Sequence, residues 1–149
     1  MSLRTVAAIA GGALVVGTLD ALDAIIFFGI RGATPRRIFQ SIAAGVLGRS
    51  AFDGDRSAEY LGVALHYLIA LLIVAAFYLI SRRVPVLTRR PVLYGVLYGI
   101  AVYFVMNYVV VPLSAAVQGP FSLPVFANGI LIHMFGIGVP AAFFARLAR

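Results

Sequence analysis

The chain contains no cysteine, no lysine and few charged side chains of any kind. Without cysteine it has no disulfides, no thiolate nucleophile and no cysteine metal site. Charged residues make up 11% of its 149 residues, less than half of the roughly 25% that is usual in a soluble domain. Hydrophobic residues make up 62%, which leaves too little polar surface to cover a water-soluble fold. The sequence therefore predicts a protein whose outer solvent is lipid.

Known catalytic motifs are missing as well. The sequence contains no HExxH zinc motif, no GxSxG nucleophile elbow, no aspartate-rich metal motif of lipid transferases and no glycine-rich phosphate loop. The segment Asp53-Gly54-Asp55 indicates a turn and not a calcium loop, because the remaining ligand spacing is missing. The sequence thus favours a protein that is not an enzyme.

Four long hydrophobic runs are present. They predict transmembrane helices over residues 6–30, 61–80, 92–113 and 124–145, each near the ~20 residues that cross ~30 Å of hydrocarbon. The first run resembles a signal peptide at its start, but it is long and has no clear cleavage site, so we expect an uncleaved span. No repeat or second domain is visible, so residues 1–149 are expected to form one all-α membrane domain, a four-helix bundle.

The long connection between the first two spans predicts a short interfacial helix over residues 35–48. Thr34 has the character of an N-cap, Pro35 suits the first helical position and Gly48 is a typical C-terminal stop. An apolar stripe runs between them, made of Ile38, Phe39, Ile42, Val46 and Leu47. With arginines at its margins, such a helix is expected to lie on the membrane surface.

All 12 basic residues are arginines, and the net charge is +7. Nucleic-acid binding would need a basic face, but these arginines stand between and beside hydrophobic runs, where lipid headgroups attract them. We therefore predict no nucleic-acid partner, and headgroup contacts for Arg36, Arg37, Arg82, Arg83, Arg89 and Arg90. The side that holds both termini and residues 82–90 carries seven arginines, and the other side carries five. This bias predicts that both termini lie in the cytoplasm.

Six polar side chains interrupt the hydrophobic runs, at Asp20, Asp23, His66, Asn107, Asn128 and His133. An aspartate near the centre of a span costs about 2.5–3.5 kcal/mol on insertion scales, so such residues are functional candidates. Counting from each span's midpoint places Asp23, His66 and Asn107 roughly 7 Å, and Asp20 and His133 roughly 2–3 Å, on the outer side of the midplane. The sequence therefore predicts a polar cluster in the outer half of the bundle.

Small residues share helix faces with these polar groups. Asp20 and Asp23 lie three residues apart, on a face with Ala13, Gly17 and Ala24. The fourth span has a comparable face, with Gly129, His133, Gly136 and Pro140, where Pro140 is expected to bend the helix. Such faces are typical of close helix packing in membranes.

The polar cluster is open to four interpretations. Its members could hydrogen-bond one another and fix the helix register, or bind and relay a proton or small cation. Asp20, Asp23, His66 and His133 could also hold a divalent metal such as zinc or manganese, and His66 with His133 could ligate a b-type haem. A homo-oligomer or an accessory, structural subunit of a larger membrane complex is expected in each case, because little of the chain lies outside the lipid.

The third and fourth spans carry a set of glycine, proline and polar positions, namely Gly95–Gly99, Pro112-Leu113, Phe121–Pro124, Asn128 and His133. In these positions, which cover about half the chain, the sequence resembles the YagU-like bacterial inner-membrane proteins. The resemblance implies a small polytopic protein of the bacterial inner membrane and assigns no activity.

Overall fold

The computed structural model describes residues 2–149, which form helices and no strand. Four helical stretches are long and apolar enough to cross a membrane. The first is α1 (Leu3–Gly29) and the second is α3 (Ser57–Arg83). The third joins α5 (Pro91–Val105), η2 (Met106–Val110) and α6 (Val111–Leu113), and the fourth joins α7 (Leu123–Ile132), η3 (His133–Gly138) and α8 (Val139–Leu147). The predicted all-α, four-span fold is confirmed.

The connection between α1 and α3 contains the expected short helix, α2 (Pro35–Leu47), followed by the 3-10 turn η1 (Gly48–Phe52). The Thr34 side chain accepts a hydrogen bond from the backbone N–H of Arg37, and Gly48 ends the helix with a φ of 62°. The apolar stripe is only partly as predicted. Val46 and Leu47 are exposed, whereas Ala43 and Ala44 are buried beside Ala51 and Ala58, because small side chains let α2 lie close against α3.

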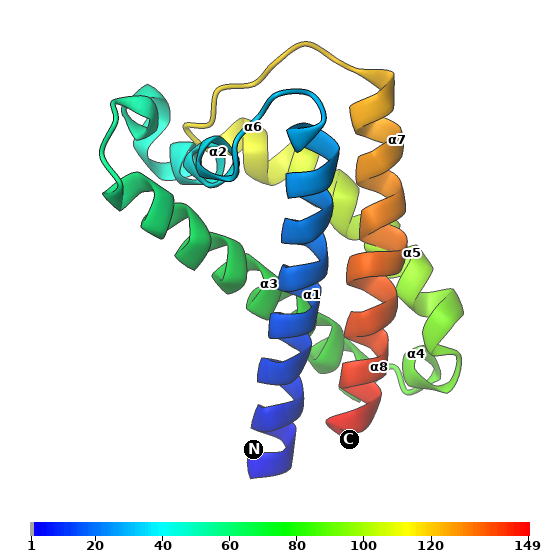
Figure 1. The fold of residues 1–149 in the computed structure, drawn as a ribbon. Coiled ribbons are helices and arrows are strands. Elements are labelled where there is room, and N and C mark those ends of the chain that lie inside the picture. Colours follow the sequence, from blue (N-terminus) through cyan, green and yellow to red (C-terminus); the bar gives the residue numbers. More distant parts are fainter. Residues whose placement is uncertain (1) are drawn as a thin grey trace.

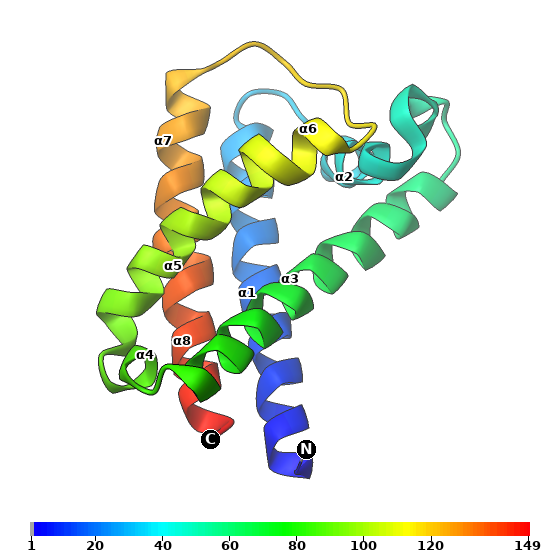
Figure 2. The ribbon, with the colours of Figure 1, turned by 180° about the vertical axis from the view of Figure 1, so that it is seen from behind.

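Both termini lie at one end of the bundle, and α2 lies at the other (Figure 1). At the end that holds the termini, α1 runs alongside the fourth span, and the Thr5 hydroxyl donates to the Ala148 carbonyl at 3.0 Å. The helices α3 and α5 are inclined to α1 in both views, and α4 (Val86–Arg89) lies between them in the chain (Figure 2). The first and last helices of the chain are thus joined at the end that holds the termini.

The apolar core lies in the half of the bundle that contains the termini. It is built from the first half of α1, the second half of α3 and α8, and its fully buried members include Val16, Val74, Phe77 and Ala141. Alanines dominate the α8 face, which lets α8 contact α1, α3 and α5 together. The polar residues of the spans lie beyond this core, toward α2. The bundle is therefore apolar in one half and polar in the other.

Two spans widen into a π-helical segment just before a proline. The segment η2 ends two residues before Pro112, and η3 ends two residues before Pro140. Proline has no N–H, and its ring clashes with the carbonyl four residues earlier, so regular α-helical bonding cannot continue. A π turn absorbs this break while keeping most backbone groups bonded, which lipid requires. The expected effect of Pro140 on the fourth span thus takes the form of a π segment that begins at His133.

Glycines allow the third and fourth spans to approach within backbone contact. A Cβ atom on Gly99 would lie 2.0 Å from the carbonyl oxygen of His133, and one on Gly138 would lie 2.0 Å from that of Gly95. Neither clash could be relieved by rotating a side chain, because each partner atom belongs to the backbone. This crossing therefore requires glycine, and it fixes the position of His133 relative to α5.

Replacing Gly99 with alanine is expected to destabilise the protein by about 1–3 kcal/mol, the usual penalty of overpacking. The matched control is Gly29→Ala, since a Cβ at Gly29 meets nothing within 4 Å. That change should be neutral or should stabilise by up to about 1 kcal/mol, because alanine favours the helix. Thermal unfolding in detergent measures both. Equal midpoints for the two variants would contradict the assigned crossing.

Candidate functional site

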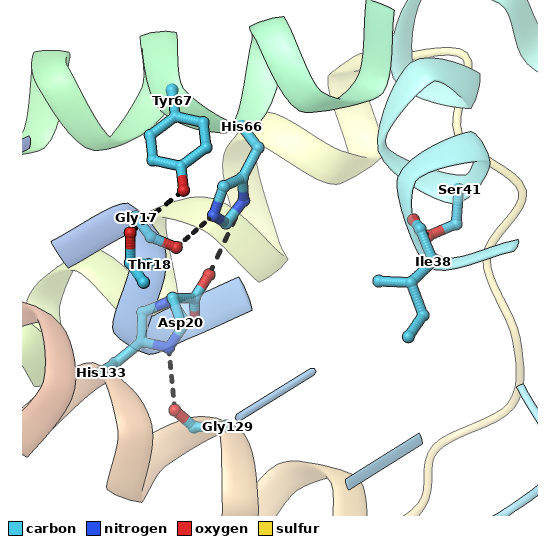
Figure 3. Close-up of polar contacts among 9 residues, drawn as sticks. All are labelled: Gly17, Thr18, Asp20, Ile38, Ser41, His66, Tyr67, Gly129 and His133. Carbon is cyan, nitrogen blue, oxygen red and sulfur yellow. Dashed lines mark hydrogen bonds and ion pairs between the residues drawn. The ribbon is translucent and has the colours of Figure 1, made fainter. Parts of the chain in front are cut away.

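Asp20 of α1 faces His66 of α3 at the edge of the apolar core (Figure 3). The Oδ2 atom of Asp20 lies 3.9 Å from Nδ1 of His66, and their side chains are 29% and 10% exposed. They come from different helices, so the contact depends on how closely α1 and α3 pack. Gly17 sets that distance, because a Cβ there would lie 2.7 Å from the ring of Tyr67 on α3.

A backbone carbonyl fixes the protonation pattern of His66. Its Nε2 atom donates to the carbonyl oxygen of Gly17 at 2.7 Å (Figure 3). A carbonyl can only accept, so Nε2 carries a hydrogen, and in a neutral ring Nδ1 is then a bare acceptor. That acceptor faces the carboxyl group of Asp20. Two acceptors that face each other repel unless a proton lies between them, so this geometry is suited to a pair that shares one proton.

His133 lies on the other side of Asp20, at the first residue of η3. No hydrogen bond or ion pair joins its ring to Asp20 among residues 2–149; the dashed contact of Asp20 in Figure 3 goes to His66. The Nδ1 atom of His133 donates to the carbonyl of Gly129 at 2.8 Å, one turn earlier in the same span, which leaves Nε2 as the acceptor of a neutral ring. Asp20 therefore lies between two imidazoles, each with one nitrogen held by a backbone carbonyl.

Aromatic rings surround the two histidines. Tyr67 packs edge-on against His66 with ring centroids 5.4 Å apart, and Tyr103 packs against His133 at 5.3 Å. The hydroxyl of Tyr67 also pairs with that of Thr18 at 3.1 Å, a second polar link between α3 and α1 (Figure 3). These aromatic neighbours and the Gly17 carbonyl were not predicted, because backbone acceptors and ring contacts leave no sequence motif.

Asp23 has a different partner. Its Oδ2 atom accepts a hydrogen bond of 2.6 Å from the side-chain amide of Asn128, which joins α1 to α7. An amide donates hydrogen bonds but does not take up a proton near neutral pH. The Asp23–Asn128 pair is therefore suited to holding two helices together. The two aspartates, predicted to share one cluster, act on two different neighbours.

Asn107 does not join the cluster, contrary to the prediction. It is exposed, and its Nδ2 donates to the carbonyl of Tyr103 in its own helix at 2.9 Å. The reason is the π segment: an extra residue per turn changes the face on which the side chain lies. Counting residues at a constant rise of about 1.5 Å predicts how far Asn107 lies from the middle of its span, but not the direction in which its side chain points.

The metal and haem interpretations fit this arrangement poorly. Across residues 2–149, no three His, Asp or Glu side chains are placed to hold one metal ion, so Asp20, Asp23, His66 and His133 do not form a four-ligand centre. A haem iron would need a free ring nitrogen on each histidine. In His66, Nε2 is bonded to Gly17 and Nδ1 faces Asp20. The geometry favours a pair formed by a carboxyl group and an imidazole.

The six arginines predicted to contact headgroups divide into two groups. Arg36 donates to the Gly54 carbonyl at 2.5 Å, and Arg37 stacks over the ring of Phe52 at 4.1 Å, so both help to fold the α2 connection. The other four are exposed at the end of the bundle that holds the termini, namely Arg82, Arg83, Arg89 and Arg90.

Comparison of the chain with protein-family models, with curated proteins and with solved structures finds no match.

The two histidines are expected to show opposite neutral tautomers, Nε2–H for His66 and Nδ1–H for His133. The physical reason is that each ring donates to a backbone carbonyl from a different nitrogen. Solid-state NMR of the protein in lipid, with ¹⁵N-labelled histidine, distinguishes the two nitrogens by chemical shift. His66→Gln and His133→Gln variants assign the signals. Finding the same tautomer at both positions would show that one of the two carbonyl contacts is wrong.

Proposed function

We propose that this protein binds a proton within the membrane at Asp20, His66 and His133, and relays it. The observation that carries the proposal is the contact between the Asp20 carboxyl and the Nδ1 acceptor of His66, 3.9 Å apart on two helices. Ionisable groups are rare inside spans, and carboxyl–imidazole chains are the usual relays of proton-moving membrane proteins. The contact thus brings a carboxyl group and an imidazole together within two membrane spans.

The arrangement of Asp20 and the two histidines supports transfer of a proton as well as its binding. A proton on Asp20 can move to the Nδ1 acceptor of His66, because that ring keeps one nitrogen for exchange. The other nitrogens of His66 and His133 stay bonded to backbone carbonyls, which cannot take up a proton, so a histidine that receives the proton passes it on only when its ring turns away from the carbonyl. A small cation is a weaker candidate ligand, since no three His, Asp or Glu side chains within residues 2–149 are placed to hold one metal ion.

Asp20→Asn is expected to abolish proton flux in liposomes that contain the purified protein, because an amide cannot exchange the proton. Asp23→Asn is the matched control: it removes the same charge three residues away but keeps an oxygen that can accept from Asn128. Flux is followed with an internal pH dye after a pH jump. Wild-type flux equal to that of protein-free vesicles would refute the proposed relay, and equal loss in both variants would refute the assignment to Asp20.

We also propose that the protein lies in a bacterial inner membrane with both termini in the cytoplasm. Support comes from the seven arginines at the end that holds the termini, against five in the α2 connection, and from the resemblance to YagU-like proteins. The three other acidic residues, Asp53 and Asp55 before α3 and Glu59 in its first turn, all lie near the α2 end. The cytoplasmic end is thus purely basic.

Single cysteines at Val84 and Val117 test this orientation, because the natural chain has none and both positions are exposed, by 42% and 54%. A membrane-impermeant maleimide added to intact spheroplasts should label Val117→Cys, and should label Val84→Cys only after lysis. Labelling of both from outside would contradict the four-span topology, and the reverse pattern would invert the orientation.

A further inference from the structure

The exposed side of η2 combines apolar surface with one polar side chain. No residue of Met106–Val110 is buried, and Phe104, Tyr108 and Val109 are 44%, 62% and 48% exposed. Phe104 and Tyr108 pack against each other with ring centroids 5.7 Å apart. Asn107 lies exposed in this surface, which we name the Asn107 face and define by Phe104, Asn107, Tyr108 and Val111.

Asn107 is incompletely bonded where lipid would surround it. Its one hydrogen bond within residues 2–149 is the donation from Nδ2 to Tyr103, so its side-chain oxygen has no donor there and a second N–H is left over. It lies about 7 Å from the middle of its span by residue count. Lipid tails offer neither donor nor acceptor, so an asparagine at this depth favours contact with another polar group.

Within residues 2–149 no side chain bonds the amide of Asn107. The two aspartates of the spans have other neighbours, since Asp23 accepts from Asn128 and Asp20 faces His66. A second copy supplies a polar partner directly. Copies inserted in the same orientation are related by a twofold axis along the membrane normal, which places identical residues opposite each other at equal depth. Two carboxamides so placed can each donate to the other's oxygen.

We propose that the Asn107 face is the contact surface of a homodimer, in which Asn107 of one copy hydrogen-bonds Asn107 of the other. The exposed Phe104 and Tyr108 rings supply the packing around this central polar pair. The proposal is independent of the proton relay, because none of its residues touches Asp20, His66 or His133 except through the buried Tyr103.

Disulfide cross-linking of the full chain in liposomes tests the dimer cleanly, since the natural sequence has no cysteine. Tyr108→Cys should give a cross-linked dimer on mild oxidation. Leu68→Cys, 48% exposed on α3, is the matched control and should stay monomeric. Equal cross-linking at both positions, or none at Tyr108→Cys, would overturn the proposal.

Adding Asn107→Leu to Tyr108→Cys should weaken dimerisation roughly 3- to 30-fold, as expected for one interhelical hydrogen-bonded contact in lipid. Asn107→Gln, which keeps the amide, should retain most of the dimer. Förster transfer between labelled copies, diluted with lipid, measures the affinity, and unchanged thermal unfolding shows that each variant folds. An unchanged affinity in Asn107→Leu would show that apolar packing alone, and not the amide pair, joins the copies.

Discussion

Close approach of helix backbones at glycine is the constraint on which the rest of this structure depends. Lipid tails are as apolar as leucine, so burying apolar side chains between helices gains little, and association relies on tight packing and interhelical hydrogen bonds. Gly99 lets α5 contact the backbone of His133, and Gly17 lets α1 contact Tyr67 of α3. The contact at Gly99 positions the imidazole of His133, and the contact at Gly17 positions that of His66. The glycines therefore build the site without contributing a side chain to it.

The prolines determine where the helices change their bonding, and the site lies at one of these places. Each of the two π segments has a polar side chain near its start: Asn107 is the second residue of η2, and His133 is the first residue of η3. Each of these side chains donates a hydrogen bond to the backbone carbonyl four residues earlier. Local bonds of this kind satisfy a carbonyl near a widened turn where lipid cannot. The two residues have the same local bond and opposite surroundings: His133 faces the bundle and Asn107 faces outward.

Much of the fold could be predicted from hydrophobic length and helix caps, because these are local properties. The short helix after Thr34-Pro35 and the four spans follow from them. Asp20, His66 and His133 could be named as candidate site residues from the sequence, since a polar residue inside a hydrophobic run is conspicuous. Three features could not be predicted: the direction of the Asn107 side chain, the separate pairing of Asp23 with Asn128, and the carbonyl partner of His66. They depend on π segments and on helix crossings, which no local sequence pattern records.

The two aspartates show how partner chemistry, and not depth alone, separates a structural polar group from a functional one. Asp23 and Asp20 lie one turn apart on α1, and both require a partner in a medium that does not solvate charge. Asp23 receives an N–H from an amide that keeps its protons, so the contact is complete and static. Asp20 faces an imidazole nitrogen that has no proton of its own in the neutral ring. The contact between Asp20 and His66 therefore differs from the amide contact of Asp23 in that it leaves room for one proton between the two groups.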